Sequence, residues 1–336
     1  MNSNGRRKFS VRAAAAAVVL GALLAGGFSA ASQAQTMTIR WGESIAANHP
    51  QVIMAERVAK EVKEKTGGRI DIQVFPNSQL GSGKEMIEMV SSGALQMTTE
   101  GAGALAAFLP PLSVIEAPYL WRDPAHMSKL AGTPFFAKLN DDLVAKRGMR
   151  MLNVTYYGKR HLTTGTKAVK TPADMAGFKI RVPPVDVFRA MAESWGARAT
   201  PIAFGELYLA LNQGVVDGQE NPLPTIQSAK LYEVQKNLVL TGHILTPRIV
   251  IANEAFLKSL SPADRAILHT ALANGEAWQN KELLSQEASL IATLKSEGMT
   301  VIEPDVALWR KPVLDTVPKK FEDKWGKGTF ESLLAL

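Results

Sequence analysis

The chain has 336 residues with 38 Lys and Arg against 31 Asp and Glu, a formal net charge of +7, and no cysteine. The lack of cysteine excludes disulfides, a thiolate nucleophile and a cysteine-ligated metal site. Four of the basic residues lie in the first 34 positions, which hold no acidic residue, so the rest of the chain carries only +3. With this small excess and no basic stripe interleaved with aromatic residues, the composition argues against a nucleic-acid-binding protein.

The first 34 residues have the layout of a secretory signal. A basic start is followed by an uncharged stretch over residues 13–31, and small residues at 32–34 suit a cleavage site. The sequence Arg6-Arg7-Lys8-Phe9-Ser10 also looks like a twin-arginine export motif. An ordinary Sec signal and a retained N-terminal anchor are the alternatives. We expect an exported protein whose signal peptide, residues 1–34, is removed.

The remaining 302 residues are enough for two domains. Alternation of apolar and polar residues predicts strands at 38–42 and 70–75, and a third strand is expected at 95–99. Apolar residues at three- and four-residue spacings predict a helix over 52–65, and a second helix is expected over 84–92. This order of strand and helix indicates an α/β fold with a parallel or mixed sheet.

A second α/β unit is expected from about residue 156. It contains a strand at 179–182, a helix over 185–195, a helix over 206–213 followed by a short strand and a polar turn, and a strand at 249–252. A longer helix is predicted over 262–296, with Ser261 as its N-cap and Pro262 at the first helical position. At 1.5 Å per residue it spans about 50 Å, so we expect it to run across both domains.

Two motifs of this second unit carry a family resemblance. The first runs from Lys159-Arg160-His161 to Gly177-Phe178-Lys179-Ile180-Arg181-Val182-Pro183, and the second covers residues 205–222. The chain thereby resembles the solute-binding proteins of TRAP transporters (tripartite ATP-independent periplasmic systems), in the family of C4-dicarboxylate receptors of DctP type. The resemblance implies a periplasmic receptor that captures a small organic anion and delivers it to the membrane permease subunits.

The resemblance also implies an architecture. It is the two-lobed periplasmic binding protein fold, an α/β fold with mixed sheets, an interdomain cleft and a long domain-spanning helix. Because the chain of such proteins crosses between lobes more than once, we expect discontinuous domains. Lobe I would comprise residues 35–157 plus 247–288, and lobe II residues 158–246 plus 289–336.

Three residues are expected to face the ligand because of this resemblance. Arg181 ends a short strand before two prolines, and a guanidinium offers a planar fork of donors that matches a carboxylate. In the family, the arginine at this position forms the salt bridge to the ligand carboxylate. A second arginine, here Arg160 just before a strand, and the asparagine of the 217–222 turn, here Asn221, also face the ligand. A local ion pair, an exposed basic pair and a turn role are the respective alternatives.

Five further candidates come from their positions. Glu43, Ser44, His49 and Glu100 lie at or just beyond expected strand ends, where open α/β sheets bind ligands, and Glu220 precedes Asn221. Carboxylates accept hydrogen bonds from hydroxyl groups, which favours a sugar acid such as glucuronate or galacturonate over a plain dicarboxylate. His49 is equally suited to cap a helix, and each of the others to a structural or solvated role. Glu220 would repel a bound carboxylate unless it faces hydroxyls or a basic partner.

No catalytic motif is recognised. The five histidines do not fall at metal-ligand spacing, and there is no Gly-x-Ser-x-Gly elbow. We therefore expect no enzyme activity, no cofactor, no metal site, no nucleic-acid partner and a monomer. The alternatives are a receptor for succinate, malate or another organic acid, including an amino acid or an aromatic acid, and, more remotely, an exported enzyme that uses Glu100 or Glu220 as a base.

Overall fold

The computed structural model describes residues 36–336, and the predicted signal segment lies outside them. The strands are β1 (Met37–Gly42), β2 (Ile70–Phe75), β3 (Met97–Gly101), β4 (Met149–Thr164), β5 (Lys179–Val182), β6 (Arg198–Pro201), β7 (Gly218–Pro222), β8 (Asn237–Asn253) and β9 (Thr300–Ile302). The helices are α1 (Pro50–Lys65), α2 (Gly83–Ser92), α3 (Ala102–Leu105), α4 (Pro124–Ser128), α5 (Pro134–Arg147), α6 (Asp186–Ser194), α7 (Leu207–Asn212), α8 (Leu223–Ser228), α9 (Glu254–Ser259), α10 (Pro262–Ser296), α11 (Val306–Trp325) and α12 (Thr329–Leu334). Within this part of the chain, no helix is long and apolar enough to cross a membrane.

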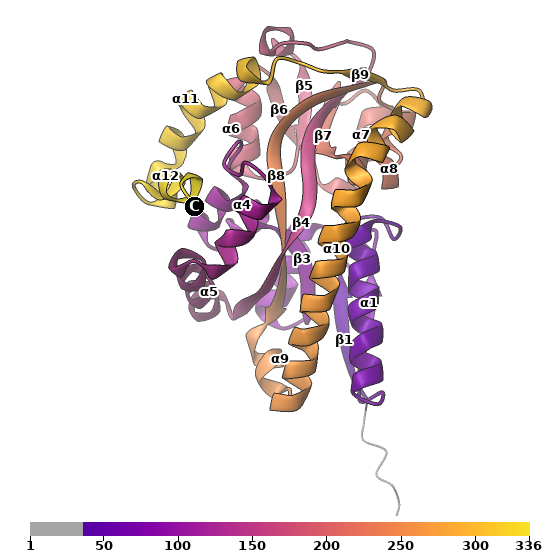
Figure 1. Ribbon diagram of the computed structural model, residues 1–336, viewed down its shortest axis with the longest axis vertical. Coiled ribbons are helices and arrows are strands. Elements are labelled where there is room, and N and C mark those ends of the chain that lie inside the picture. The colour runs from indigo at the N-terminus through magenta and orange to yellow at the C-terminus, as the bar shows by residue number, and fades with distance from the viewer. Residues whose placement is uncertain (1–35) are drawn as a thin grey trace, which may run out of the picture. The chain divides into compact units, whose positions relative to one another are not determined.

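The strands form one mixed sheet of nine strands within residues 36–336. Their order is β2-β1-β3-β8-β4-β7-β5-β6, with β9 beside β8. The two outer groups, β2-β1-β3 and β7-β5-β6, are parallel. In contrast, β8 pairs antiparallel with β3 and β4, β4 pairs antiparallel with β7, and the short β9 pairs parallel with β8. The predicted mixed α/β fold is confirmed, and the two parallel groups are joined by two long shared strands (Figure 1).

The long strands β4 and β8 change register three times along their length. One shift falls between Tyr156 and Gly158, and another between Arg160 and Leu162. Gly158 has φ +123°, and a Cβ atom there would lie 2.7 Å from the Cβ of Pro222. Only glycine fits this backbone and this close approach. The bulges therefore bend the sheet beside the strand positions that carry Arg160.

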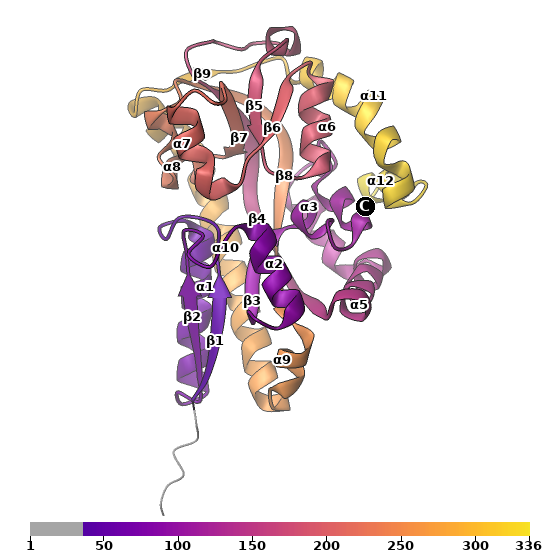
Figure 2. The ribbon, with the colours of Figure 1, turned by 180° about the vertical axis from the view of Figure 1, so that it is seen from behind.

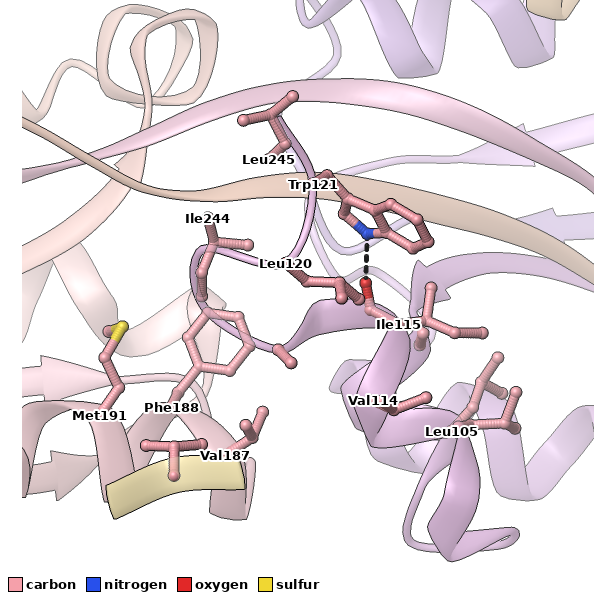
Figure 3. Packing of buried hydrophobic residues seen from close by; sticks show 14 of the residues in the cluster. Leu105, Val114, Ile115, Leu120, Trp121, Val187, Phe188, Met191, Ile244 and Leu245 are labelled. Atoms are coloured by element: carbon pink, nitrogen blue, oxygen red, sulfur yellow. Dashed lines mark hydrogen bonds between the residues drawn. The ribbon is translucent and has the colours of Figure 1, made fainter. Parts of the chain in front are cut away.

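Helices cover both faces of the sheet (Figures 1 and 2). On one face, α1, α9 and the first half of α10 pack against β1 and β2, and the second half of α10 packs with α7 and α8. On the other face, a larger core joins α2, α3, α5, α6 and α11. Figure 3 shows part of that core, where Phe188 of α6 lies beside Ile244 of β8 and the indole of Trp121 donates to the carbonyl of Ile115 at 2.8 Å. Helices thus lie on both faces of the sheet, as parallel strands require, while the edge strand β6 has no buried residue.

The long helix α10 begins and ends where the sequence predicts. The side chain of Ser261 accepts a hydrogen bond from the backbone N–H of Asp264, and Pro262 is the first helical residue. Leu268 and Leu272 pack with α1, whereas Leu290 and Leu294 belong to the cluster of α7 and α8. One helix thus joins the cluster of α1 to that of α7 and α8, while the two domains that it is expected to span, and their boundaries, stay a prediction.

Most predicted elements are confirmed within two residues, and three local predictions are wrong. Residues 218–222 form the buried strand β7, so Asn221 does not lie in a turn. Arg160 does not precede a strand but lies inside β4, which begins already at Met149. The third strand runs from Met97 to Gly101, so Glu100 is within it rather than after it. In each case sheet pairing extends through polar residues whose composition is typical of turns.

Candidate functional site

Arg181 is a buried cation that lacks an acidic partner. Its side chain is 2% exposed, and its only hydrogen bond to another residue of the 36–336 region runs from Nε to the carbonyl oxygen of Ile202, at 2.9 Å. No carboxylate of that region lies within ion-pair distance of it. Burial lowers the pKa of Arg181 to about 9, although the nearby Glu220 favours the charged form. Arg181 is therefore still cationic at neutral pH, and both Nη groups are free to bind an anion.

Arg160, in contrast, has an acidic partner. Its Nε and Nη2 atoms lie 2.5 and 2.8 Å from the two carboxylate oxygens of Glu220, and Nη2 also donates to the Asn221 side-chain oxygen at 3.0 Å. The pairing follows from the sheet, because β4 and β7 are antiparallel neighbours. The Arg160 guanidinium also lies 5.1 Å from the ring centroid of Phe188. These contacts fix the orientation of the Arg160 guanidinium, and they show that Glu220 faces a basic partner.

Behind Glu220 lies a histidine. The Nε2 atom of His243 is 3.0 Å from Glu220 Oε2, and its Nδ1 atom is 2.7 Å from the Thr241 hydroxyl. Burial lowers the pKa of His243 although Glu220 opposes this. Burial by itself would raise the pKa of Glu220, but Arg160 and His243 hold it below its usual value. Glu220 is therefore an ionised carboxylate that orients Arg160.

A second ion pair joins β8 and β3. Arg248 Nη1 lies 2.8 Å from Glu100 Oε2, and Glu100 Oε1 accepts a hydrogen bond from the Ser44 hydroxyl at 2.9 Å. The Arg248 guanidinium also lies 4.3 Å from the ring centroid of Tyr157. Its Nε atom is buried and has no hydrogen-bond partner within residues 36–336. Glu100 and Tyr157 thus hold the Arg248 guanidinium in place, while its Nε–H donor has no acceptor in the described residues.

Glu43 and His49 lie in a fully buried layer next to this pair. Gln51 Nε2 lies 2.5 Å from Glu43 Oε2, while Glu43 Oε1 is without a partner in the described part of the chain. Burial is the main cause that raises the pKa of Glu43 to about 8. His49 caps α1 by accepting the Gln51 N–H at Nδ1, its ring stacks on Tyr157 at 4.9 Å, and burial lowers its pKa to about 3. The capping alternative for His49 is confirmed.

The arginines and carboxylates form one enclosed cluster. Arg160, Glu220 and Arg248 all act on the pKa of Arg181, so they lie within electrostatic reach of it. The loops that follow β2 and β6 also meet, since a Cβ atom on Gly205 would lie 3.4 Å from the Ser78 hydroxyl oxygen, and Ser78 donates to the carbonyl of Ser44 at 3.1 Å. Charges kept this far from water interact strongly, which suits the capture of a small ion.

The predicted site residues therefore fall into three groups. The first group is Arg181 with the hydrogen-bonded residues Arg160, Glu220 and Asn221. The second is Glu100, which contacts both Ser44 and Arg248. The third is Glu43 and His49 in the adjacent buried layer. Their roles toward a ligand stay predictions.

Sequence reasoning missed Arg248, His243 and Tyr157. One signal was present, because Arg248 is a charge directly before the apolar run of residues 249–252, at the start of an expected strand. A charged side chain at such a position is either exposed to solvent or forms an ion pair in the interior. For His243 and Tyr157 the spacing along the chain offers no comparable signal.

The comparisons with known proteins agree with this architecture. The family model described as bacterial extracellular solute-binding protein, family 7, matches residues 41–324. A solute-binding protein of Verminephrobacter eiseniae is 36% identical over 304 residues, 90% of each chain. The sialic acid-binding periplasmic protein SiaP of Vibrio cholerae is 32% identical over 308 residues, 92% of this chain and 95% of that one.

Solved structures of similar proteins cover nearly the same length. A TRAP periplasmic solute-binding protein of a Polaromonas species, bound to D-erythronate, has a TM-score of 0.84 and 33% identity and covers 89% of this chain and 99% of its own. The sugar acid-binding protein DctPAm of Advenella mimigardefordensis, in complex with galactonate, has a TM-score of 0.85 at 29% identity, covering 90% and 97%. A TRAP protein of Sulfurospirillum deleyianum with bound succinate has a TM-score of 0.84 at 27% identity, covering 90% and 99%. The chain therefore belongs to family 7 of the bacterial extracellular solute-binding proteins, the periplasmic solute receptors of TRAP transporters.

Proposed function

We propose that this receptor captures a sugar acid, most plainly a uronate such as glucuronate or galacturonate, and delivers it unchanged to its permease. The observation that carries the proposal is Arg181, a buried guanidinium with no carboxylate partner in residues 36–336. A buried charge without a partner is costly, and a ligand carboxylate removes that cost. The planar guanidinium can bind both carboxylate oxygens at once.

The other residues of the cluster take separate roles in this proposal. Arg160, oriented by Glu220, and Asn221 would bind the same carboxylate or an adjacent hydroxyl, and their mutual contact supports a shared role. Ser44, Glu100 and the neutral Glu43 offer acceptors for hydroxyl groups farther along the ligand. His49 supports this wall by capping α1. The residues needed for a carboxylate at one end and hydroxyls at the other are thus present.

Binding would stabilise a closed arrangement of the two lobes. The ligand would bridge Arg181 in one lobe and the Glu100 region in the other, and this shifts the population toward the closed form. The protein would be exported with a cleaved signal peptide, act as a monomer and carry out no chemistry on its ligand.

A C4-dicarboxylate is the second candidate, because one similar protein holds succinate. Both candidates can be tested together by thermal unfolding of the chain without residues 1–34. The panel comprises glucuronate, galacturonate, galactonate, gluconate, succinate, malate, sialic acid, amino acids and aromatic acids. A ligand at about 1,000 times its dissociation constant adds about 4 kcal/mol to the free energy of unfolding.

We expect the largest rise in melting temperature with a sugar acid. A rise with succinate or malate alone would keep the receptor and overturn the sugar-acid assignment. If none of the acids raises the melting temperature, the carboxylate site itself is wrong.

A further inference from the structure

The three arginines of the cluster, of which Arg160 and Arg181 are buried and Arg248 is half-buried, differ in their acidic partners. Arg160 is paired with Glu220, and Arg248 with Glu100, each through at least one contact of 2.8 Å or less. Arg181 has no such partner within residues 36–336. The cluster therefore offers one uncompensated cation, which matches one carboxylate.

The surroundings of Arg248 are acidic rather than basic. Glu100 contacts it directly, and Glu116 lies close enough to favour its charged form. Glu43 lies close as well, since Arg248 acts on its pKa, and burial and Glu100 both raise that pKa. Arg248 thus lies among three carboxyl groups, and Glu100, which contacts it directly, already compensates the charge that a second anion would need.

We propose that the Glu100–Arg248 pair makes the receptor selective for ligands with a single carboxylate, and that Glu100 is the residue that rejects dicarboxylates. This inference rests on the proposed function, with Arg181 holding the one ligand carboxylate. Beyond that function, dicarboxylates are the acids that bind poorly, and Glu100 is the residue that excludes them.

The physical reason is competition for one guanidinium. A second ligand carboxylate near Arg248 would have to displace Glu100, and this leaves Glu100 as a buried charge without a partner. If it did not displace Glu100, two carboxylates would lie side by side in a site closed to water, where like charges repel strongly. A neutral hydroxyl meets neither cost, since it can donate to Glu100 and accept from the unpaired Nε of Arg248. Rejection by a built-in like charge is a common source of specificity.

Three six-carbon acids test this directly by isothermal titration calorimetry. Galacturonate and galactonate each carry one carboxylate, and galactarate carries a carboxylate at both ends of the same hydroxylated chain. For the wild type we expect galactarate to bind about a hundredfold more weakly than the better of the two monoacids, a difference of about 2.7 kcal/mol. In Glu100→Gln, Arg248 loses its charged partner while the shape is kept. We expect the ratio of the galactarate and monoacid affinities to rise at least about tenfold.

Glu254→Gln is the matched control. Glu254 forms a two-contact pair with Arg150 at 2.6 and 2.9 Å, and neither residue contacts an arginine or carboxylate of the cluster. This variant should leave the affinity ratio unchanged. Should Glu100→Gln not fold, Glu100→Asp, which draws the carboxylate back from Arg248, should shift the ratio in the same direction by a smaller factor.

The outcomes separate this inference from the function on which it rests. A wild type that binds galactarate as tightly as the monoacids overturns the inference and leaves the receptor intact. So does an unchanged ratio in a folded Glu100 variant. A wild type that binds succinate or malate but none of the three acids overturns the inference together with the sugar-acid assignment.

Discussion

The same residue type serves different purposes in this cluster according to its neighbours. Arg160 and Arg248 each lie against a carboxylate, whereas Arg181 lies against a backbone carbonyl. A paired guanidinium can orient other groups but has little charge left for a ligand. In the proposed function, the unpaired one determines affinity.

Replacing Arg181 by Ala should weaken binding of the preferred acid by about a thousandfold, because breaking a buried ion pair costs about 3–5 kcal/mol. Arg181→Lys should also bind poorly, since a point charge does not reproduce the planar fork. Isothermal titration measures both. A loss smaller than about tenfold in Arg181→Ala would show that another residue anchors the carboxylate.

The site could be predicted from the sequence only in part. Arg181 was identifiable because it stands in a local motif, between a short strand and two prolines. Arg248 was not, because its partner Glu100 is 148 residues away and meets it only through the pairing of β3 with β8. Whether an arginine is paired depends on such long-range contacts, which spacing along the chain does not contain.

At the scale of elements, the long helix α10 depends on a close approach to α1. Gly275 lies at their contact, where a Cβ atom would come within 2.8 Å of the Val58 side chain and 3.1 Å of the Met54 side chain. Helix boundaries were predictable here because capping and periodicity are local signals. The lengths of β4 and β8 were not, because polar residues and glycines that face the site interrupt the apolar pattern inside both strands.

Gly275→Ala should destabilise the protein although alanine favours a helix by about 1 kcal/mol. The added methyl group would force α1 and α10 apart, and overpacking of this kind costs about 1–3 kcal/mol. Chemical denaturation followed by circular dichroism measures the change. Ser289→Ala, at an exposed position of the same helix, is the control and should leave the free energy of unfolding nearly unchanged. Equal or greater stability of Gly275→Ala would contradict the close helix contact.

At the scale of the whole molecule, several buried titratable groups make stability depend on pH. His49 and His161 have pKa values lowered to about 3, mainly by burial, from 6.5. Between pH 3 and 6.5 the unfolded chain therefore binds more protons, and the free energy of unfolding rises with pH. Glu43 has the opposite effect, because its pKa is raised by burial from 4.5 to about 8. Between these values the folded state binds the extra proton, and stability falls as pH rises.

We therefore expect the free energy of unfolding to rise from pH 3 toward about pH 6.5 and to decline from there to about pH 8. Urea denaturation over this range measures the profile. Glu43→Gln should remove most of the decline above pH 6.5 and make the rise between pH 4.5 and 6.5 steeper, because the opposing effect of Glu43 is lost there too. A decline of the same size in this variant would show that Glu43 is not the group responsible.

The central claim is that the receptor recognises its ligand through one ligand carboxylate, which binds the guanidinium of Arg181. The most direct measurement compares, by isothermal titration, the acid that raises the melting temperature most with the neutral polyol or sugar in which a CH₂OH group replaces that carboxylate. We predict that the neutral compound binds about a thousandfold more weakly, because it leaves the buried guanidinium without a partner. Affinities of the acid and the neutral compound within about tenfold of each other would contradict the account.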